Sequence, residues 1–320
     1  MRIDPQIGAL RGDPAAQRAS QAALEQVRDA WLATAAAPVI AQLADYGDGA
    51  CLQSCDALRV LMDDPDAARS AIDALFAPML AHLQHNPLGF VPLRHQQADS
   101  FAMLQLARAG RAALTLVAYR EFAQDPASVG FGGGELHEIV LAGAADILRF
   151  DLVEETPLGA AIERSPRRVV AGDRVTCADS RTTRLVAEVH GHLVMLRLSR
   201  SDEVPEDMRQ FALADGRLLH RASGSRDESR REIAMAVLGR MGRADAAPLL
   251  AELSCEGSPH IRWQSLRECL ALDSGTGFRA LCRIASDVED PLSSVAGALR
   301  ARLIEAHPEL SRLETTPCLA

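Results

Sequence analysis

The sequence contains no lysine, so all 34 of its basic residues are arginine. This absence excludes every site that needs a lysine amine: a Walker A loop, a kinase strand lysine, a pyridoxal Schiff base or a lysine general base. The chain is also rich in alanine, and we attribute both features to GC-rich codon usage. Abundant arginine alone therefore does not indicate a phosphate-binding surface.

Other scarcities argue against particular partners. Two tryptophans and two tyrosines are too few for a platform that stacks nucleic-acid bases. A net charge of −9 also argues against nucleic acid as a partner, because neutralisation of phosphates dominates that affinity. The seven cysteines are scattered and odd in number, which fits reduced thiols better than a disulfide framework.

Long hydrophobic runs and hydrolase motifs are missing as well. No apolar run approaches the roughly 20 residues that span a bilayer, and the first residues lack the pattern of a secretory signal. We therefore expect a cytoplasmic protein without a membrane partner. GxSxG, HExxH and paired CxxC motifs do not occur. With 48% hydrophobic and 24% charged residues, the 320-residue chain is globular and long enough for two or three domains.

Residues 1–88 have helical periodicity and predict a helical domain. The best-marked helix begins at Asp64, which can cap it, and Pro65 suits the first helical position. Apolar residues then form one stripe along this helix: Ile72, Leu75, Phe76, Met79, Leu80 and Leu83.

Residues 89–224 change from a helical to an alternating pattern. Strand-length apolar runs flank Gly110, Gly143, Gly191 and the pair Asp215-Gly216. A glycine between two such runs is typical of a hairpin turn, and Asp-Gly is among the strongest hairpin signals. Four successive hairpins predict an antiparallel β-barrel or sandwich.

Residues 225–320 return to helix and contain an internal repeat. At an offset of 32 residues, similar positions recur: Ala234 and Leu266, Leu238 and Leu270, Leu249 and Leu281, and Pro259 and Pro291. A period of this size is typical of paired-helix repeats. Residues 228–307, above all "LGRMGRADAAPLLAEL", resemble HEAT-like repeats of the PBS-lyase type. The resemblance implies an α-solenoid that docks another protein or peptide, and the whole chain is then a multidomain α+β protein.

Within the β segment, "LAGAADILRFD" and "RVVAGDRV" resemble the cupin β-barrel. A metal-binding cupin supplies an HxH pair and a glutamate from one motif and a histidine from a second. Here no HxH pair precedes Gly143, and Val175 stands near the second histidine position, so the resemblance is to the barrel and not to its metal motif. We expect no cofactor. The alternative is one divalent ion (Fe, Mn, Ni or Zn) on donors outside the family pattern: Glu135, His137, His190 and His192.

The string "EVHGHLV" around Gly191 has two interpretations. In one continuous strand, Glu188, His190 and His192 would share a face and could hold a metal. We favour a hairpin instead, with His190-Gly191 as its two-residue turn, because glycine adopts positive φ freely and histidine does so more often than most residues. In that case His190 lies at the tip and His192 on the returning strand.

Three further clusters are candidates for ligand binding. A run of glycines can form a nest for an anion or a lid, a polar pair follows the helical segment, and two arginines suit carboxylate or phosphate. These are Gly132, Gly133 and Gly134; Arg94 and His95; and Arg167 and Arg168. The plain alternatives are a flexible loop, a solvated linker and a solvated turn.

Two functions compete. The first is a non-catalytic interaction protein, in which a cupin-like barrel binds a small molecule or peptide and the HEAT-like segment docks a protein. The second is a metal-dependent cupin-type enzyme, for example a non-heme iron oxygenase, with a non-standard ligand set. We favour the first, because the metal motif is incomplete and catalytic motifs are missing.

Overall fold

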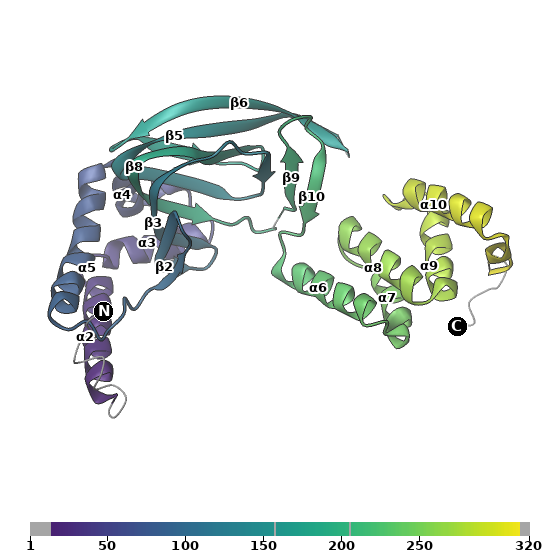
Figure 1. Ribbon diagram of the computed structural model, residues 1–320, viewed down its shortest axis with the longest axis horizontal. Helices are drawn as coiled ribbons and strands as arrows, with labels where there is room; N and C mark the ends of the chain where they lie inside the picture. The colour runs from purple at the N-terminus through teal and green to yellow at the C-terminus, as the bar shows by residue number, and fades with distance from the viewer. Residues whose placement is uncertain (1–13, 157, 205, 314–320) are drawn as a thin grey trace, which may run out of the picture. The chain divides into compact units, whose positions relative to one another are not determined.

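The computed structural model describes residues 14–156, 158–204 and 206–313. The chain divides between Arg221 and Ala222 into two compact units. Unit 1 combines helices with two antiparallel sheets, and unit 2 is helical (Figure 1). The predicted α+β class is therefore confirmed, whereas the predicted boundary at residue 88 falls inside unit 1. None of the described helices has both the length and the apolar character that crossing a membrane requires.

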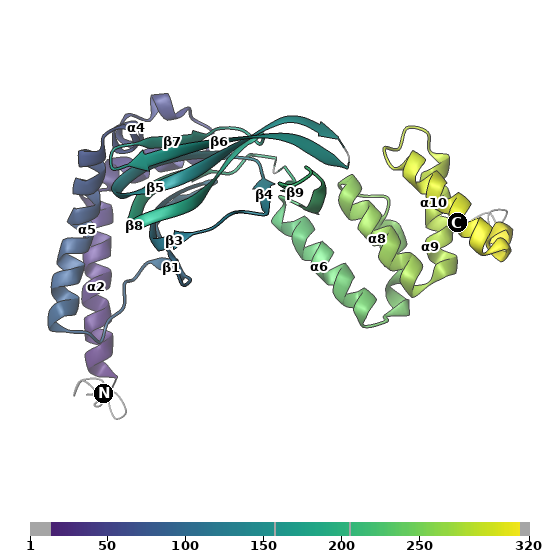
Figure 2. The same cartoon turned by 45° about the horizontal axis from the view of Figure 1, so that its top comes forward.

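Helices open unit 1, and α2 and α5 lie side by side at one end of the larger sheet (Figures 1 and 2). α5 begins as predicted, because Asp64 Oδ1 accepts hydrogen bonds from the N–H groups of Asp66 (2.9 Å) and Ala67 (3.3 Å). Its stripe is buried at Leu75 and Met79, but Leu80 is 55% exposed. The elements are α2 (Ala15–Ala33), α3 (Ala37–Gly47), the 3-10 turn η1 (Leu52–Ser54), α4 (Asp56–Asp63) and α5 (Pro65–His85).

The strands form one large and one small antiparallel sheet. The large sheet has the order β1-β2-β3-β8-β5-β6, with β7 also pairing with β5, and the small one has the order β10-β9-β4. The bounds are β1 (Arg94–Gln97), β2 (Phe101–Ala109), β3 (Ala112–Ala123), β4 (Ser128–Phe131), β5 (Glu135–Thr156), β6 (Gly159–Val170), β7 (Arg174–Cys177), β8 (Thr182–Arg200), β9 (Met208–Ala212) and β10 (Leu218–Ala222).

One face of the large sheet is covered by the helices. Leu114, Ile139 and Leu196 from this face belong to the same buried cluster as Leu58 and Leu75 from the helices. Burying these side chains removes apolar surface from water on both partners, which stabilises the pair of layers together. The helical segment and the sheet therefore share one core. The opposite, inner face of the sheet has its own cluster, centred on valines and Met195.

Two of the four predicted hairpins are confirmed and two are wrong. Chain reversal occurs at Gly110, between β2 and β3, and at Gly216, between β9 and β10. Gly143 and Gly191 instead lie inside β5 and β8, which run unbroken for 22 and 19 residues and pair with each other. Both glycines have positive φ, +84° and +80°. The two glycines therefore adopt the positive φ that the hairpin prediction required, but the chain continues in the same direction through both of them.

Gly191 belongs to a β-bulge. Val189 stands opposite Phe122 and His192 stands opposite Arg120, so two residues of β8 oppose one residue of β3. The pairing with β5 is irregular at the same level, next to Gly143. Bulges bend the strand that contains them and increase its twist. These irregularities allow both long strands to curve across the interior of unit 1.

Unit 2 consists of helices that pack on their neighbours along the chain. Leu250, Leu266, Phe278 and Leu281 are fully buried in its core. The helices are α6 (Arg226–Arg240), the 3-10 turn η2 (Ala244–Ala246), α7 (Ala247–Leu253), α8 (Pro259–Leu272), α9 (Ser274–Ser286), α10 (Ser293–Ala306) and the 3-10 turn η3 (Pro308–Leu313). This packing does not identify a HEAT repeat or a solenoid, which stay predictions.

We expect Gly143→Ala to destabilise unit 1 strongly. A Cβ at this position would lie 1.8 Å from the His192 carbonyl oxygen, and the left-handed backbone alone costs a side chain about 1–3 kcal/mol. Gly297→Ala is the control, because Gly297 lies inside α10 with nothing within 4 Å of an added Cβ. The control should leave stability unchanged or raise it by up to about 1 kcal/mol. Urea unfolding measures the free energy of unfolding of both variants. Equal losses in Gly143→Ala and Gly297→Ala would contradict the close approach of Gly143 to β8 at the bulge.

Candidate functional site

A polar cleft of about 240 Å³ opens where β5 begins and β8 ends. Segments far apart in the sequence form its walls: the glycine loop 132–134, the connection between β7 and β8, and both ends of β8. Hydroxyl groups, backbone amides and two carboxylates dominate the lining. The residues are Gly132, Gly133, Gly134, Glu135, Leu136, Cys177, Asp179, Thr182, Thr183, Ser199, Arg200 and Ser201.

The glycine loop requires its last glycine. Gly134 has φ +108°, and a Cβ there would lie 2.5 Å from the carbonyl oxygen of Arg200. A residue without a side chain lets the loop pass directly along the end of β8, with a backbone that other residues rarely adopt. The glycine run therefore lines a cleft, and its last glycine is needed because the loop passes close to the backbone of β8.

A polar node fastens this end of the sheet to the helices. Arg200 donates from Nη2 to Glu135 Oε1 (2.5 Å) and from Nη1 to the carbonyl oxygens of Tyr46 (2.8 Å) and Ala50 (2.7 Å). Its guanidinium also lies 4.1 Å above the ring of Tyr46, whose hydroxyl donates to Glu135 Oε2 (2.7 Å). Burial alone would raise the pKa of Glu135, but the hydrogen bonds from Tyr46 and Arg200 hold it below its usual value.

Deeper on the inner face, one buried carboxylate accepts hydrogen bonds from two arginines. The Glu138 side chain is fully buried, and those of Arg184 and Arg197 are 6% and 22% exposed. Arg184 Nε donates to Oε2 and Arg197 Nε to Oε1, each at 2.7 Å, and Arg184 Nη2 also bonds Oε1. Burial alone would raise the pKa of Glu138, but the two positive charges outweigh it and lower this pKa.

This ion cluster neighbours the cleft along β5 and β8, although none of its three side chains lines the cleft. Ser199 and Leu136 line the cleft, and Arg197 and Glu138 follow two residues further along the same strands. Residues two apart in a strand point to the same face, about 7 Å apart along it. The cluster contains two positive charges and one negative charge. Its surplus positive charge lies at Arg197, the member that solvent reaches most.

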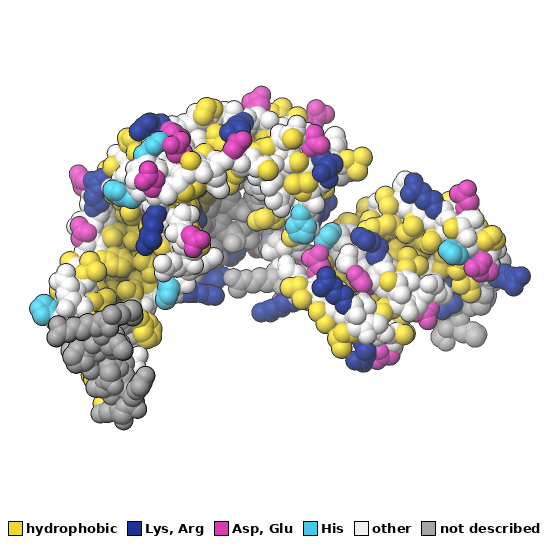
Figure 3. Space-filling model, viewed as in Figure 1, with side chains coloured by type: hydrophobic (Ala, Val, Ile, Leu, Met, Phe, Trp, Pro, Cys, Tyr) yellow, Lys and Arg dark blue, Asp and Glu magenta, His cyan; other side chains and the backbone are white. Residues whose placement is uncertain are grey.

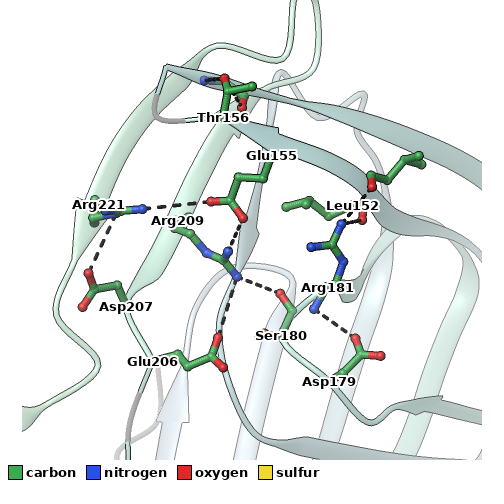
Figure 4. A network of polar contacts seen from close by, with 12 residues as sticks. Leu152, Glu155, Thr156, Asp179, Ser180, Arg181, Glu206, Asp207, Arg209 and Arg221 are labelled. Atoms are coloured by element: carbon green, nitrogen blue, oxygen red, sulfur yellow. Dashed lines mark hydrogen bonds and ion pairs between the residues drawn. The ribbon is translucent and has the colours of Figure 1, made fainter.

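A polar network holds the wall that Asp179 contributes (Figure 4). Arg209 of β9 binds Glu155 at the end of β5 and donates to the carbonyl oxygen of Ser180 (2.9 Å). Arg181 donates to the carbonyl oxygen of Leu152 (2.6 Å), and Arg221 of β10 approaches Glu155. The connection between β7 and β8 is thus attached to both sheets, which gives the cleft a defined wall.

The structure separates the remaining predicted binding residues from the cleft. Arg94 and His95 lie exposed on β1, where the His95 ring bonds the Leu93 carbonyl oxygen (3.1 Å). Arg167 and Arg168 lie exposed on β6, and Arg167 donates to the Arg174 carbonyl oxygen (3.1 Å). Neither pair lines this cleft.

The four predicted metal donors lie in two separate pairs, Glu135 with His137 and His190 with His192, and a metal site shared by all four stays a prediction. His137 stands opposite Leu198, six residues from His192 along β8, which corresponds to about 20 Å of strand. His190 instead bonds Asp146 (2.9 Å), and His137 lies 3.6 Å from Glu135. Within the described ranges, no group of three or more His, Cys, Asp or Glu side chains is placed to hold a metal ion.

Sequence reasoning missed the ion cluster. Glu138 stands in the apolar run "HEIVLAG", and Arg197 alternates with leucines in "VMLRLS". Both residues occupy positions that face the inner core, where an unpaired charge would be costly. A charge on an otherwise apolar strand face was the available signal. Arg184, however, comes from a distant part of β8, and no local pattern could indicate that it meets Glu138.

No protein-family model matches the sequence, and no curated protein matches it. Solved structures resemble parts of the chain at low scores. The 7S globulin of Momordica charantia is 14% identical over 39% of this chain and 36% of its own, with a TM-score of 0.27. The chain thus spans about a third of that globulin.

Two further solved structures are similar to a comparable degree. The DMSP lyase of Ruegeria pomeroyi is 18% identical over 43% of this chain and 64% of its own, with a TM-score of 0.27. The cupin domain of Drosophila melanogaster CENP-C is 12% identical over 33% and 74%, with a TM-score of 0.27.

We expect Glu138→Gln to cost about 3–5 kcal/mol at neutral pH, because it leaves the buried Arg184 and the largely buried Arg197 without a counter-charge. Since the folded-state pKa of Glu138 is lowered, its contribution is present above the ordinary value of 4.5 and is lost as the pH falls through the folded value. The variant should therefore lose less stability than the parent on acidification.

Chemical unfolding between neutral pH and pH 3 measures both effects. Glu163→Gln, on the exposed part of β6, serves as the control and should behave like the parent. Equal acid sensitivity of parent and Glu138→Gln would contradict the role assigned to the buried carboxylate.

Proposed function

We propose that unit 1 is a non-catalytic binding module for a small anionic molecule, anchored by the guanidinium of Arg197. The observation that carries this proposal is the charge of the ion cluster. In the part of the chain that the structure describes, Glu138 is the one carboxylate that pairs with Arg184 or Arg197. Buried charges are stable when they are paired, so the second arginine favours an anion from outside the protein.

The cleft supplies the access and the remaining contacts. Its hydroxyl groups at Thr183, Ser199 and Ser201 form no side-chain hydrogen bond among the described residues, so they are free to bind polar groups of a ligand. Arg197 Nε is used by Glu138, which leaves its terminal nitrogens for a carboxylate or phosphate. A cleft of about 240 Å³ suits a ligand of metabolite size.

Two features favour binding over catalysis. The nucleophile in the cleft, Cys177, is disfavoured as a thiolate because burial raises the pKa of its thiol. The alternative proposal, a metal-dependent cupin-type enzyme, gains no support from the histidines, which the fold separates. Unit 2 would then act as the docking scaffold for another protein, as HEAT-like repeats do.

We expect small carboxylates or phosphate monoesters to raise the melting temperature of the protein, and uncharged amides and alcohols of the same size to have no effect. Arg197→Gln should weaken the binding of the best anion by about 10–100-fold, because a charge-assisted hydrogen bond contributes about 1.5–3 kcal/mol. Calorimetric titration of the anion measures this loss.

Arg217→Gln is the matched control for this experiment, because Arg217 is 65% exposed and outside the cleft. The control should bind the anion like the parent. Uncharged analogues that bind as tightly as the anions, or an Arg197→Gln variant with unchanged affinity, would contradict the proposal.

We also expect a chelator to leave the melting temperature unchanged, because the predicted ligands lie apart. Elemental analysis of the purified protein, with and without chelator, checks this expectation. Stoichiometric iron, manganese, nickel or zinc that disappears in His137→Ala would contradict it.

A further inference from the structure

A second cleft, of about 330 Å³, lies on the opposite, helix-facing side of the large sheet. Its floor crosses three neighbouring strands at Ala102, Ala118 and Val194, which stand side by side in register. Leu104 and Leu116, two residues further along, are covered by the helices. The cleft therefore begins where that cover ends, and the two alanines make its floor low.

The turn between β1 and β2 forms a wall of this cleft. The N–H group of Ala98 donates to the Phe101 carbonyl oxygen (2.8 Å), which closes the turn. The N–H group of Arg120 donates to the Ser100 carbonyl oxygen (3.0 Å), which attaches the turn to β3. The wall is thus fixed by backbone hydrogen bonds from two strands, so the cleft is formed before any ligand binds.

Charged and polar side chains surround the apolar floor. Arg120 and His192 stand opposite each other on β3 and β8, Gln97 is the last residue of β1, and Asp99 comes from the turn. Among the described residues, no side-chain hydrogen bond or ion pair engages Arg120, His192 or Asp99, and all three are exposed. Figure 3 shows apolar side chains gathered over β2 and β3, with basic, acidic and histidine side chains around them.

An apolar cleft with a few convergent polar groups is the usual form of a small-molecule site. Arg120 with the neighbouring His192 suits a carboxylate, since arginine binds a carboxylate through two parallel hydrogen bonds. Asp99 provides the opposite charge and suits an ammonium group. The alanine floor leaves room for one aliphatic side chain.

We propose that this cleft binds a small aliphatic zwitterion of the α-amino-acid class. Its carboxylate is held by Arg120 and His192, its ammonium group by Asp99, and its side chain by the floor of Ala102 and Ala118. This site uses no residue of the anion site below the glycine loop. It therefore does not rest on the function proposed above.

The test is calorimetric titration of the full chain with three probes: L-leucine, N-acetyl-L-leucine and L-leucinamide. L-leucine should bind, and each derivative, which lacks one of the two charges, should bind at least about tenfold more weakly. Absence of binding by L-leucine at millimolar concentration, or equal binding of all three probes, would overturn the proposal.

Two variants distinguish the roles of the charges. Arg120→Gln should weaken the binding of L-leucine about tenfold or more. It should not alter the binding of L-leucinamide, which has no carboxylate. Asp99→Asn should weaken the binding of L-leucine. It should not weaken the binding of N-acetyl-L-leucine, which has no ammonium group. Arg108→Gln, at the other end of β2, is the matched control and should bind L-leucine like the parent.

A competition experiment separates this site from the anion site. A saturating concentration of inorganic phosphate should leave the affinity of the parent protein for L-leucine unchanged. Competition between phosphate and L-leucine would place the zwitterion at the anion site and overturn the assignment to this cleft.

Discussion

The shape of unit 1 depends on the ion pairs that the buried Glu138 carboxylate forms with Arg184 and Arg197. Glu138 pairs in register with Arg197, yet its other partner, Arg184, stands opposite Arg149, which lies eleven residues further along β5. In a straight strand those eleven residues would span about 35 Å. The two long strands must therefore curve back over the interior for Arg184 to reach Glu138, and the bulges beside Gly143 and Gly191 permit that curvature.

The two faces of the large sheet have different tasks. One face is covered by helices, and the Arg200, Glu135 and Tyr46 node ties its end to α3. The other face surrounds the ion cluster, because β5 and β8 curve over it. Each face has an opening where its cover stops: the inner face beside the glycine loop and the helix-facing side beside the β1–β2 turn. At both openings, hydrogen bonds hold a wall in place. Each opening also has an arginine nearby, Arg197 or Arg120, whose guanidinium has donors that no described residue uses.

Local patterns in the sequence were sufficient for much of this fold. The Asp64 cap, the hairpins at Gly110 and Gly216, and the change from helix to strand and back all depend on residues close in the chain. Gly143 and Gly191 show the limit of such patterns. Both positions require positive φ, but a glycine with positive φ occurs in hairpin turns and in β-bulges alike. Which one forms is decided by the pairing of β5 with β8, between residues far apart in sequence.

The sequence by itself determined the α+β class, the absence of lysine chemistry, the incomplete cupin metal motif and the special backbone of the glycines. Only the tertiary structure decided which charged residues meet. His137 and His192 look like partners in the sequence but lie far apart along the paired strands β5 and β8, whereas Glu138 and Arg184 share no motif and form a buried ion pair. The reason is physical: burial selects charges that can be paired across the interior, and the curvature of the long strands sets which side chains cross it.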